Sequence, residues 1–339
     1  MSAVSFENVS IVFGDTPEVA LPLMDDGLER GDIQQKTGQV LGVHNCTLSV
    51  EPGEILVLMG LSGSGKSTLL RAVNGLNPVV RGAVKVMTDK GEVNVTDAKG
   101  EALRQVRRSE IAMVFQQFGL LPWRTVRENV GLGLELAGMS RSERKAKVDE
   151  QLDLVGLSDW ADRKVGELSG GMQQRVGLAR AFVTNAPILL MDEPFSALDP
   201  LIRTRLQDEL LELQERLNRT IIFVSHDLDE AFKLGDRIAI MEGGRIVQWG
   251  TPRDIYSDPA NDYVADFVAN MNPLGVLCAR DVMEPASAER ATKMGPDDEI
   301  ADVIQAVLDG AEPVAVVDGG AVIGQVSKSS VLRRISGVE

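Results

Sequence analysis

The stretch Gly60-Leu61-Ser62-Gly63-Ser64-Gly65-Lys66-Ser67-Thr68 decides the fold of this chain. It follows the apolar run 55–59 and precedes the apolar segment 69–73, which predicts a buried strand, a glycine-rich turn and then a helix. The spacing matches the phosphate-binding P-loop. Glycines let backbone N–H groups converge on an anion, and the helix N-terminus adds a partial positive charge. The alternative is a loose glycine turn before a lysine; the flanking strand and helix favour a nucleotide site.

Two acids follow a second buried strand. The apolar run 188–191 ends in Asp192 and Glu193. In a parallel sheet the strand ends lie beside the phosphate loop, so Asp192 is expected to meet magnesium together with the Ser67 hydroxyl, while Lys66 reaches the terminal phosphates. Glu193 is then placed to polarise a water for in-line attack on the terminal phosphate. An apolar run ending in two acids is a weak signal alone and a strong one beside a P-loop.

The chain has only two histidines, and they differ in setting. His226 follows the apolar strand 220–225, which belongs to the same predicted sheet. We expect His226 to touch the terminal phosphate and to hold Glu193 and the water in line, although a histidine after a buried strand is more often structural. His44 lies within a strand and has no partner motif, which indicates a structural role.

The segment Leu168–Arg175 opens a helix with a serine and two glycines. One interpretation is an ordinary N-cap and turn. The other is a second anion site, formed again by backbone amides at a helix N-terminus.

Composition limits the class of protein. A chain of 339 residues predicts about two domains with full cores, and its 44% apolar and 25% charged residues are ordinary for a soluble globular protein. No apolar run approaches the roughly 20 residues that cross a bilayer, and the N-terminus has no secretory pattern, so we expect a cytosolic protein. Cys46 and Cys278 are expected to be reduced. The net charge of −15 argues against binding to nucleic acid or anionic lipid, so another protein must hold the chain at any membrane.

The order of elements predicts an α/β fold with a largely parallel sheet. Strand patterns cover residues 4–13, 40–50, 111–115 and 220–225, and hairpins are expected at 84–95 and at 237–249. Residues 125–157 are expected to be helical, and leucines at 206, 210, 213 and 217 form a helical stripe that packs on a sheet. Thr16–Gln39 is polar and rich in turn residues, which indicates an insertion or a short helix.

Taken together, four segments resemble the motifs of an ABC transporter ATPase. Gly60–Thr68 resembles the Walker A motif, Leu168–Arg175 the signature, Ile188–Asp199 the Walker B motif with its D-loop, and His226 the switch histidine. The resemblance covers roughly residues 4–270. It implies a P-loop ATPase domain at 1–271, with a mixed core sheet, an antiparallel β subdomain and a helical subdomain at about 117–180.

The resemblance also implies a head-to-tail homodimer that encloses two ATP molecules with Mg²⁺. Each site takes Lys66 and Ser67 from one copy and Ser169 with Gly171 from the other. The resemblance implies that Asp199 ends the D-loop, that Gln116 senses magnesium and the membrane partner, and that Phe13 stacks on adenine. The expected catalytic residues are Glu193, His226, Gln116 and Lys66, and the expected magnesium ligands are Ser67, Gln116 and Asp192. The expected ATP-binding residues are Phe13, Gly60, Ser62, Gly63, Ser64, Gly65, Lys66, Ser67, Thr68, Ser169, Gly170, Gly171, Gln173 and Asp199.

A finer resemblance is to ATPases of quaternary amine importers, for glycine betaine, proline betaine and choline, with the choline branch the most similar. It rests on residues 36–43, 59–68, 112–116 and 195–203. It implies an integral membrane permease and a periplasmic or extracellular binding protein as partners, no nucleic acid, and a place on the cytoplasmic face of the inner membrane. Residues 116–129, with apolar Leu120, Leu121, Pro122 and Trp123, are expected either to receive the permease or to be ordinary core.

The C-terminal residues form a separate small segment in the sequence. Residues 272–339 resemble a single CBS-like module, best matched at Pro313–Val326, with a regulatory or docking role. The functional alternative is a soluble ABC-type ATPase without a permease. Such proteins usually carry a coiled-coil insertion or two ATPase units, and this chain has neither pattern.

Overall fold

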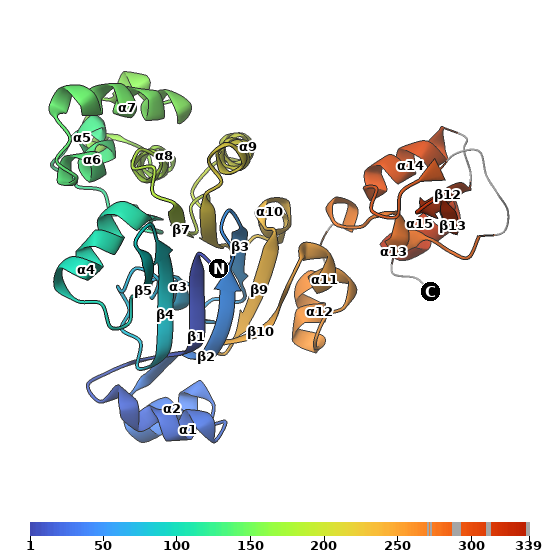
Figure 1. The fold of residues 1–339 in the computed structure, drawn as a ribbon, viewed down its shortest axis with the longest axis horizontal. Helices are drawn as coiled ribbons and strands as arrows, with labels where there is room; N and C mark the ends of the chain where they lie inside the picture. The colour runs from blue at the N-terminus through green and yellow to red at the C-terminus, as the bar shows by residue number, and fades with distance from the viewer. Residues whose placement is uncertain (270, 272, 287–292, 310–312, 337–339) are drawn as a thin grey trace. The chain divides into compact units, whose positions relative to one another are not determined.

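The computed structural model describes residues 1–269, 271, 273–286, 293–309 and 313–336. The chain divides into two compact units (Figure 1). Unit 1 comprises Met1–Asp227 and Leu234–Trp249, and unit 2 comprises Leu228–Lys233 and Gly250–Glu339. The expected division between residues 271 and 272 stays a prediction, since residue 272 lies outside the described residues. The longer segment of unit 2 begins at Gly250.

A mixed core sheet in unit 1 places the site. Its strand order is β10 (Arg245–Gly250), β9 (Arg237–Glu242), β3 (Ile55–Met59), β8 (Thr220–Val224), β7 (Ile188–Asp192) and β6 (Ile111–Val114). Every neighbouring pair from β9 to β6 is parallel. Strands β3, β7 and β8 are buried along their whole length, as their continuous apolar sequences require. Their carboxyl ends therefore share one edge of the sheet, as predicted.

An antiparallel sheet forms the second layer of unit 1. Its order is β2 (Val40–Val50), β1 (Val4–Phe13), β4 (Arg81–Thr88) and β5 (Gly91–Asn94), which confirms the predicted strands and the hairpin. The inward residues of both sheets join one hydrophobic core, in which Phe6 and Val84 of this sheet are clustered with Leu56 and Ile222 of the core sheet. Burial of this shared apolar surface holds the two sheets together.

The insertion Thr16–Gln39 is helical, which confirms one of the two expectations for it. It contains a 3-10 turn (Pro17–Ala20) and helices α1 (Leu21–Asp25) and α2 (Arg30–Thr37), drawn in blue (Figure 1). Met24 and Ile33 are buried against Val12 and Leu41 at the ends of β1 and β2. The Asp25 carboxylate also accepts two hydrogen bonds from Arg81 of β4, at 2.7 and 2.8 Å. The insertion is therefore packed on the antiparallel sheet.

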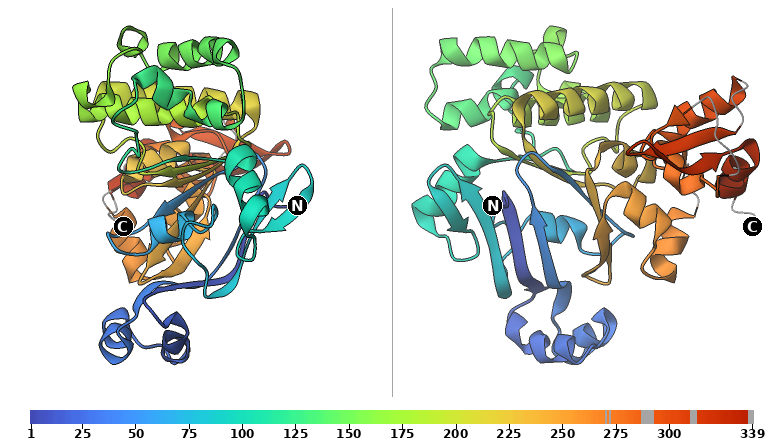
Figure 2. Two further views of the ribbon diagram at one scale, coloured as in Figure 1. Left: turned by 90° about the vertical axis from the view of Figure 1, so that its left-hand side faces the viewer. Right: turned by 45° about the vertical axis from the view of Figure 1, so that its right-hand side comes forward.

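The predicted helical region is part of unit 1. That region, in green in Figure 2, contains α5 (Val126–Val130), α6 (Leu132–Leu136), α7 (Arg141–Leu154) and α8 (Gly170–Phe182). The remaining helices are α3 (Lys66–Leu70), α4 (Gly100–Gln105), a π-helical turn (Val106–Glu110) and α9 (Pro200–Leu217). Leu206 and Leu210 of α9 are buried as predicted, but Leu217 is exposed because the helix ends there.

Trp123 is 68% exposed, so the alternative of ordinary core was wrong for this residue.

Unit 2 has its own small core. Its elements are α10 (Leu228–Leu234), α11 (Pro252–Ser257), α12 (Asp262–Val268), α13 (Ala279–Val282), β11 (Lys293–Met294), α14 (Ile300–Leu308), β12 (Val314–Asp318), β13 (Ala321–Val326) and α15 (Lys328–Ser336). Strand β12 pairs in parallel with β11 and antiparallel with β13. Arg253 binds the buried Asp281 carboxylate through both nitrogens that face it, which ties α11 to α13. The CBS likeness of this unit stays a prediction.

Candidate functional site

The P-loop lies between β3 and α3, and its backbone requires glycine. Gly60 has φ +134°, and a Cβ added there would approach the Met241 carbonyl oxygen to 2.1 Å. Gly65 has φ +103°, and its Cβ would come within 2.7 Å of the Gly42 oxygen. Both positions combine a left-handed backbone with a close neighbouring backbone, so a side chain would displace the loop.

Lys66 is the first residue of α3, and its side chain lies within the loop. Its Nζ donates to the carbonyl oxygens of Gly60, at 2.7 Å, and Leu61, at 3.0 Å. Burial lowers the pKa of the Lys66 ammonium, and the nearby charges of Glu193 and Asp192 oppose that shift. A buried cation therefore stands between the phosphate loop and the two acids, where an anionic ligand would stabilise it.

Asp192 joins the P-loop to the end of β7. The Ser67 hydroxyl donates to Asp192 Oδ1 at 2.6 Å, and Arg71 donates to Oδ2 at 2.8 Å. The Asp192 side chain is fully buried, so these two hydrogen bonds satisfy a carboxylate that no water reaches. Sequence reasoning missed Arg71. Its available signal was the spacing of four residues from Ser67, which places both side chains on one face of a helix.

Glu193 follows β7, and side chains from the ends of the two neighbouring strands approach its carboxylate. Gln116, after β6, donates from Nε2 to Glu193 Oε2 at 3.1 Å. His226, after β8, has its Nδ1 3.5 Å from the same oxygen. The structure thus brings together Lys66, Ser67, Gln116, Asp192, Glu193 and His226, all at the carboxyl edge of the core sheet. The roles of these residues in catalysis and metal binding stay predictions.

Phe13 lies beside the P-loop although the insertion separates it from the loop in sequence. Its ring reaches within 2.9 Å of the place that a Gly42 Cβ would take, and the Thr68 Cγ2 is 3.0 Å from the same point. The side chain is 38% exposed. Strands β1 and β2 pair from Val4–Val50 to Phe13–Val40. The chain therefore leaves the sheet after Phe13 and re-enters it at Val40, directly opposite, and the insertion between them forms a loop outside the sheet. Phe13 therefore offers an aromatic face beside the C-terminal end of the loop.

The glycine-rich start of α8 forms an N-cap, with the Ser169 hydroxyl accepting from the Met172 N–H at 3.4 Å. An added Cβ on Gly171 would lie 3.2 Å from the Ala197 carbonyl oxygen, while the space around Gly170 is open. Gln173 donates to the Val165 and Leu168 carbonyl oxygens at 3.3 and 3.1 Å. The N-cap interpretation is confirmed, and the anion site at this tip stays a prediction.

Asp199 has a local structural partner of its own. Its carboxylate caps α9 by accepting from the Ile202 N–H at 3.1 Å. The predicted contact of this residue with a nucleotide or a second copy stays a prediction.

Arg30 is a residue that sequence reasoning missed. It begins α2 of the insertion, and its guanidinium donates to the carbonyl oxygen of Gly63 in the P-loop and to that of Gly42, the latter at 3.0 Å. Burial lowers the pKa of this arginine. No sequence pattern marks it, because it is one charge in a polar segment and its partners lie 12 and 33 residues away.

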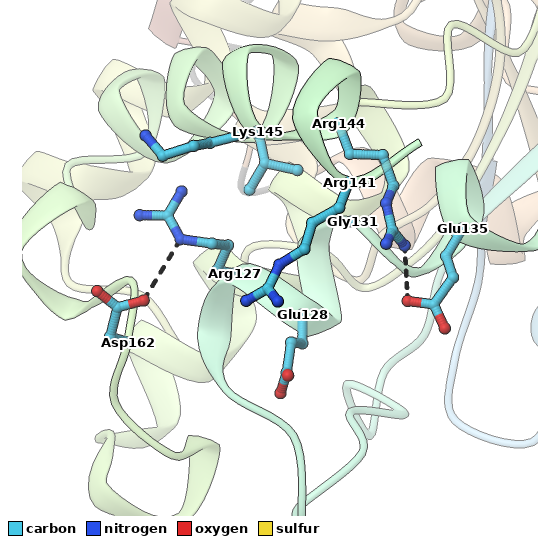
Figure 3. A pocket seen from close by; sticks show the side chains of 9 residues that line it. Arg127, Glu128, Gly131, Glu135, Arg141, Arg144, Lys145 and Asp162 are labelled. Carbon is cyan, nitrogen blue, oxygen red and sulfur yellow. Dashed lines mark hydrogen bonds and ion pairs between the residues drawn. The ribbon is translucent and has the colours of Figure 1, made fainter. Parts of the chain in front are cut away.

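A separate cavity of about 450 Å³ lies among α5, α6 and α7 (Figure 3). Its charges are largely paired with each other: Arg127 binds Asp162 at 3.4 Å, and Arg144 binds Glu135 at 2.7 Å. The predicted nucleotide residues are not among those that line it. This cavity is therefore an ion-paired surface of the helical region and not the candidate active site.

Two further features are absent from the described residues. No group of three or more His, Cys, Asp or Glu side chains in that part of the chain could hold a metal ion. No helix there has both the length and the apolar character needed to span a membrane.

Comparisons with known proteins agree with this geometry. Residues 43–196 match the ABC transporter family. The glycine betaine/proline betaine transport ATP-binding protein ProV of Escherichia coli (strain K12) is 50% identical over 279 residues, which cover 82% of this chain and 69% of ProV. The trimethylamine N-oxide transport ATP-binding protein TmoW of Ruegeria pomeroyi is 41% identical over 97% of this chain and 96% of its own.

A solved structure extends the likeness to the fold. The dimeric post-hydrolysis structure of the ATP-binding cassette MJ0796, bound to ADP and Pi, has a TM-score of 0.63 at 32% identity and covers 74% of this chain and 99% of that one. The chain therefore belongs to the family of ABC transporter ATPases. It binds and hydrolyses ATP.

Arg30 supplies the first testable prediction. Arg30→Met is expected to raise the KM for ATP about tenfold with little change in kcat. Arg30 holds the Gly63 carbonyl of the P-loop in place, so without it the loop must be ordered when ATP binds. A hydrogen bond from a charged group is worth about 1.5 kcal/mol, and an ordering cost of about 1.4 kcal/mol corresponds to tenfold in binding. Steady-state ATPase assays across ATP concentrations measure both constants.

Arg81→Met is the matched control for this prediction. It removes another anchor of the insertion, the ion pair with Asp25, and does not contact the P-loop. An equal rise of KM in both variants would contradict a specific role for Arg30, since it would show that any loosening of the insertion has the same effect.

Proposed function

We propose that this chain is the ATPase subunit of an importer for small methylated amines, and that it works as a head-to-tail homodimer beneath a membrane permease. The ATPase part of this proposal rests on one observation. The P-loop, Asp192, Glu193, Gln116 and His226 lie together at one edge of the core sheet. The substrate class comes from the relatives. ProV is named for glycine betaine and proline betaine, and TmoW for trimethylamine N-oxide. These solutes share a compact, methylated nitrogen that bears a positive charge, as does choline.

Magnesium fits the donors that the structure brings together. Ser67 Oγ and Asp192 Oδ1 lie 2.6 Å apart, and hard oxygen donors of this kind suit Mg²⁺, which usually completes its shell with phosphate oxygens and water. Ser67 and Asp192 would hold the ion, and the ion would neutralise charge on the phosphates. Gln116 contacts Glu193, the residue after Asp192, and is placed to respond to an ion held by Ser67 and Asp192.

The side chains around Glu193 suit hydrolysis. The Glu193 carboxylate would take the proton of the attacking water, and His226 would orient that water from the neighbouring strand end. When ATP binds, the Lys66 ammonium would give up its hydrogen bonds to the Gly60 and Leu61 carbonyl oxygens and bind the terminal phosphates. Ser169 and Gly171 at the tip of α8 would cover the nucleotide of the partner copy, where exposed amides at a helix N-terminus favour an anion.

A groove of about 350 Å³ in unit 1 suits a helix of the permease. It is lined by apolar side chains that include Leu76, Met113, Phe115, Leu132 and Leu136. Leu136 is 61% exposed, which leaves an apolar surface free for a partner. Phe115 immediately precedes Gln116, so a helix in this groove would act on the residue that contacts Glu193. This placement would keep the chain on the cytoplasmic face of the membrane.

A solute-uptake assay tests the proposal. Cells that lack this chain are expected to lose uptake of labelled glycine betaine, and the wild-type chain is expected to restore it. Excess unlabelled choline, proline betaine and trimethylamine N-oxide then rank the solutes by competition, and co-purification from detergent identifies an integral membrane partner. Unchanged uptake in the deleted cells, together with a chain that purifies without a membrane protein, would favour the soluble ABC-type ATPase instead.

A further inference from the structure

Gln174 is a buried amide on α8 whose two ends both bind the catalytic region. Its side chain is among the least exposed polar groups of the described residues, with 1% of the residue accessible. Its Nε2 donates to the Glu193 carbonyl oxygen at 3.1 Å, and its Oε1 accepts from the Ala197 N–H at 3.0 Å. A buried amide must find such partners, and here they lie on the segment that follows β7.

The backbone of Glu193 needs this support. Its φ is +49°, a left-handed conformation that costs a non-glycine residue about 1 kcal/mol and persists only where the surroundings hold it. The Glu193 N–H donates to the Val224 carbonyl of β8 at 3.1 Å. Its carbonyl accepts from Gln174 and from the Ser196 hydroxyl, the latter at 3.0 Å. The peptide is thus fixed from both sides.

This backbone sets the direction of the Glu193 carboxylate. The left-handed turn sends the side chain toward Gln116 and His226, which approach the same Oε2 at 3.1 and 3.5 Å. A displacement of about 1 Å at a reacting group is enough to cost a large part of the rate. Holding the peptide of Glu193 therefore matters for catalysis even though Gln174 does not reach the reacting atoms.

We propose that Gln174 is a positioning residue for ATP hydrolysis, which holds Glu193 toward its water and holds Ala197 in the segment that leads to Asp199. This inference rests on the proposed role of Glu193 as the general base. Gln174 lies one turn along α8 from Ser169–Gly171, the tip proposed to cover the nucleotide of the partner copy. A movement of this tip when it covers the partner's nucleotide would therefore be transmitted to Glu193 through α8 and the two hydrogen bonds of Gln174.

Gln174→Met tests the positioning role, since it removes both hydrogen bonds at similar side-chain volume. We expect kcat for ATP hydrolysis to fall about 10- to 100-fold, a large part of what a positioned base contributes, while the KM for ATP changes less than about twofold. Gln214→Met is the matched control. Gln214 lies on α9 and donates to the Gly53 carbonyl, away from Glu193, so its variant should keep the wild-type kcat and KM.

Gln174→Glu separates the two hydrogen bonds by pH. The carboxylate still accepts from Ala197 but repels the Glu193 carbonyl, whereas the protonated acid can donate to it. Burial raises the pKa of a carboxyl, so kcat of Gln174→Glu relative to Gln174→Met should rise as pH falls from 8 to 6. The titratable groups on the neighbouring segments are Asp192, Glu193, Asp199, Arg203, His226 and Asp227, and both variants retain them all.

The outcomes distinguish this inference from the proposed function. If Glu193→Gln keeps wild-type turnover, the assignment of the base fails. If Glu193→Gln is inactive while Gln174→Met turns over normally, the base stands and the role of Gln174 is overturned. If Gln174→Met does not fold, the ratio of Gln174→Glu to wild type across pH decides, and a flat ratio overturns the proposal.

Discussion

Glu193→Gln is expected to lower ATP turnover about 100-fold or more, the loss that follows removal of a positioned general base. The amide has the shape of the carboxylate but cannot take a proton from water. It also removes a negative charge beside the terminal phosphate, so ATP should remain bound and a nucleotide-loaded dimer should accumulate. Phosphate release measures turnover, and light scattering with and without ATP and magnesium measures the dimer.

The control for this variant is a carboxylate of α9. Glu209 pairs with Arg205 on the same helix at 2.9 Å, a contact of the kind that contributes only a few tenths of a kcal/mol. Glu209→Gln should therefore turn over ATP as the wild type does. Normal turnover by Glu193→Gln would refute its role as the base, and turnover lost without any nucleotide-dependent dimer would contradict the trapped state.

Lys66→Met is expected to weaken ATP binding about 10- to 100-fold, and to affect adenosine binding little. A charged hydrogen bond to a phosphate contributes about 1.5–3 kcal/mol, and each 1.4 kcal/mol is tenfold in affinity. Lys66→Arg should not restore the affinity, because the nitrogen lies between the Gly60 and Leu61 carbonyls, where a compact ammonium fits and a planar guanidinium does not. Equilibrium titration with ATP and with adenosine measures the contrast.

Lys145→Met serves as the control for Lys66→Met. Lys145 pairs with Asp149 one turn along an exposed face of α7, so its loss should leave nucleotide binding unchanged. Equal weakening of ATP and adenosine in Lys66→Met would contradict a phosphate contact and indicate a collapsed loop instead.

The P-loop and the acids after β7 could be predicted because their signals are local. Gly60 and Gly65 are required by their own backbone conformations, and a continuous apolar run such as 188–191 specifies a strand buried on both faces. Once strands and helices alternate, parallel pairing places the strand ends at one edge, so Asp192 and Glu193 could be assigned to the same site as Ser67.

Other parts of the site could not be predicted, because they depend on residues that only folding brings together. Arg30 contacts Gly63 from an insertion with no informative pattern. Arg71 contacts Asp192 across 121 residues of sequence, and its four-residue spacing from Ser67 places it beside that serine without naming Asp192 as its partner. Phe13 was expected near adenine only by resemblance, and the placement of the insertion outside the sheet is what leaves its ring beside the P-loop.

By itself the sequence determined the class of fold, the phosphate loop and the identity of the acids, since backbone requirements and apolar periodicity act over a few residues. Only the tertiary structure decided how those groups are held. A buried amide such as Gln174 has no sequence signature, because its importance lies in the two backbone groups that packing places beside it. Trp123 likewise could not be placed from its apolar sequence context, because the packing of the folded chain decides that its side chain is exposed.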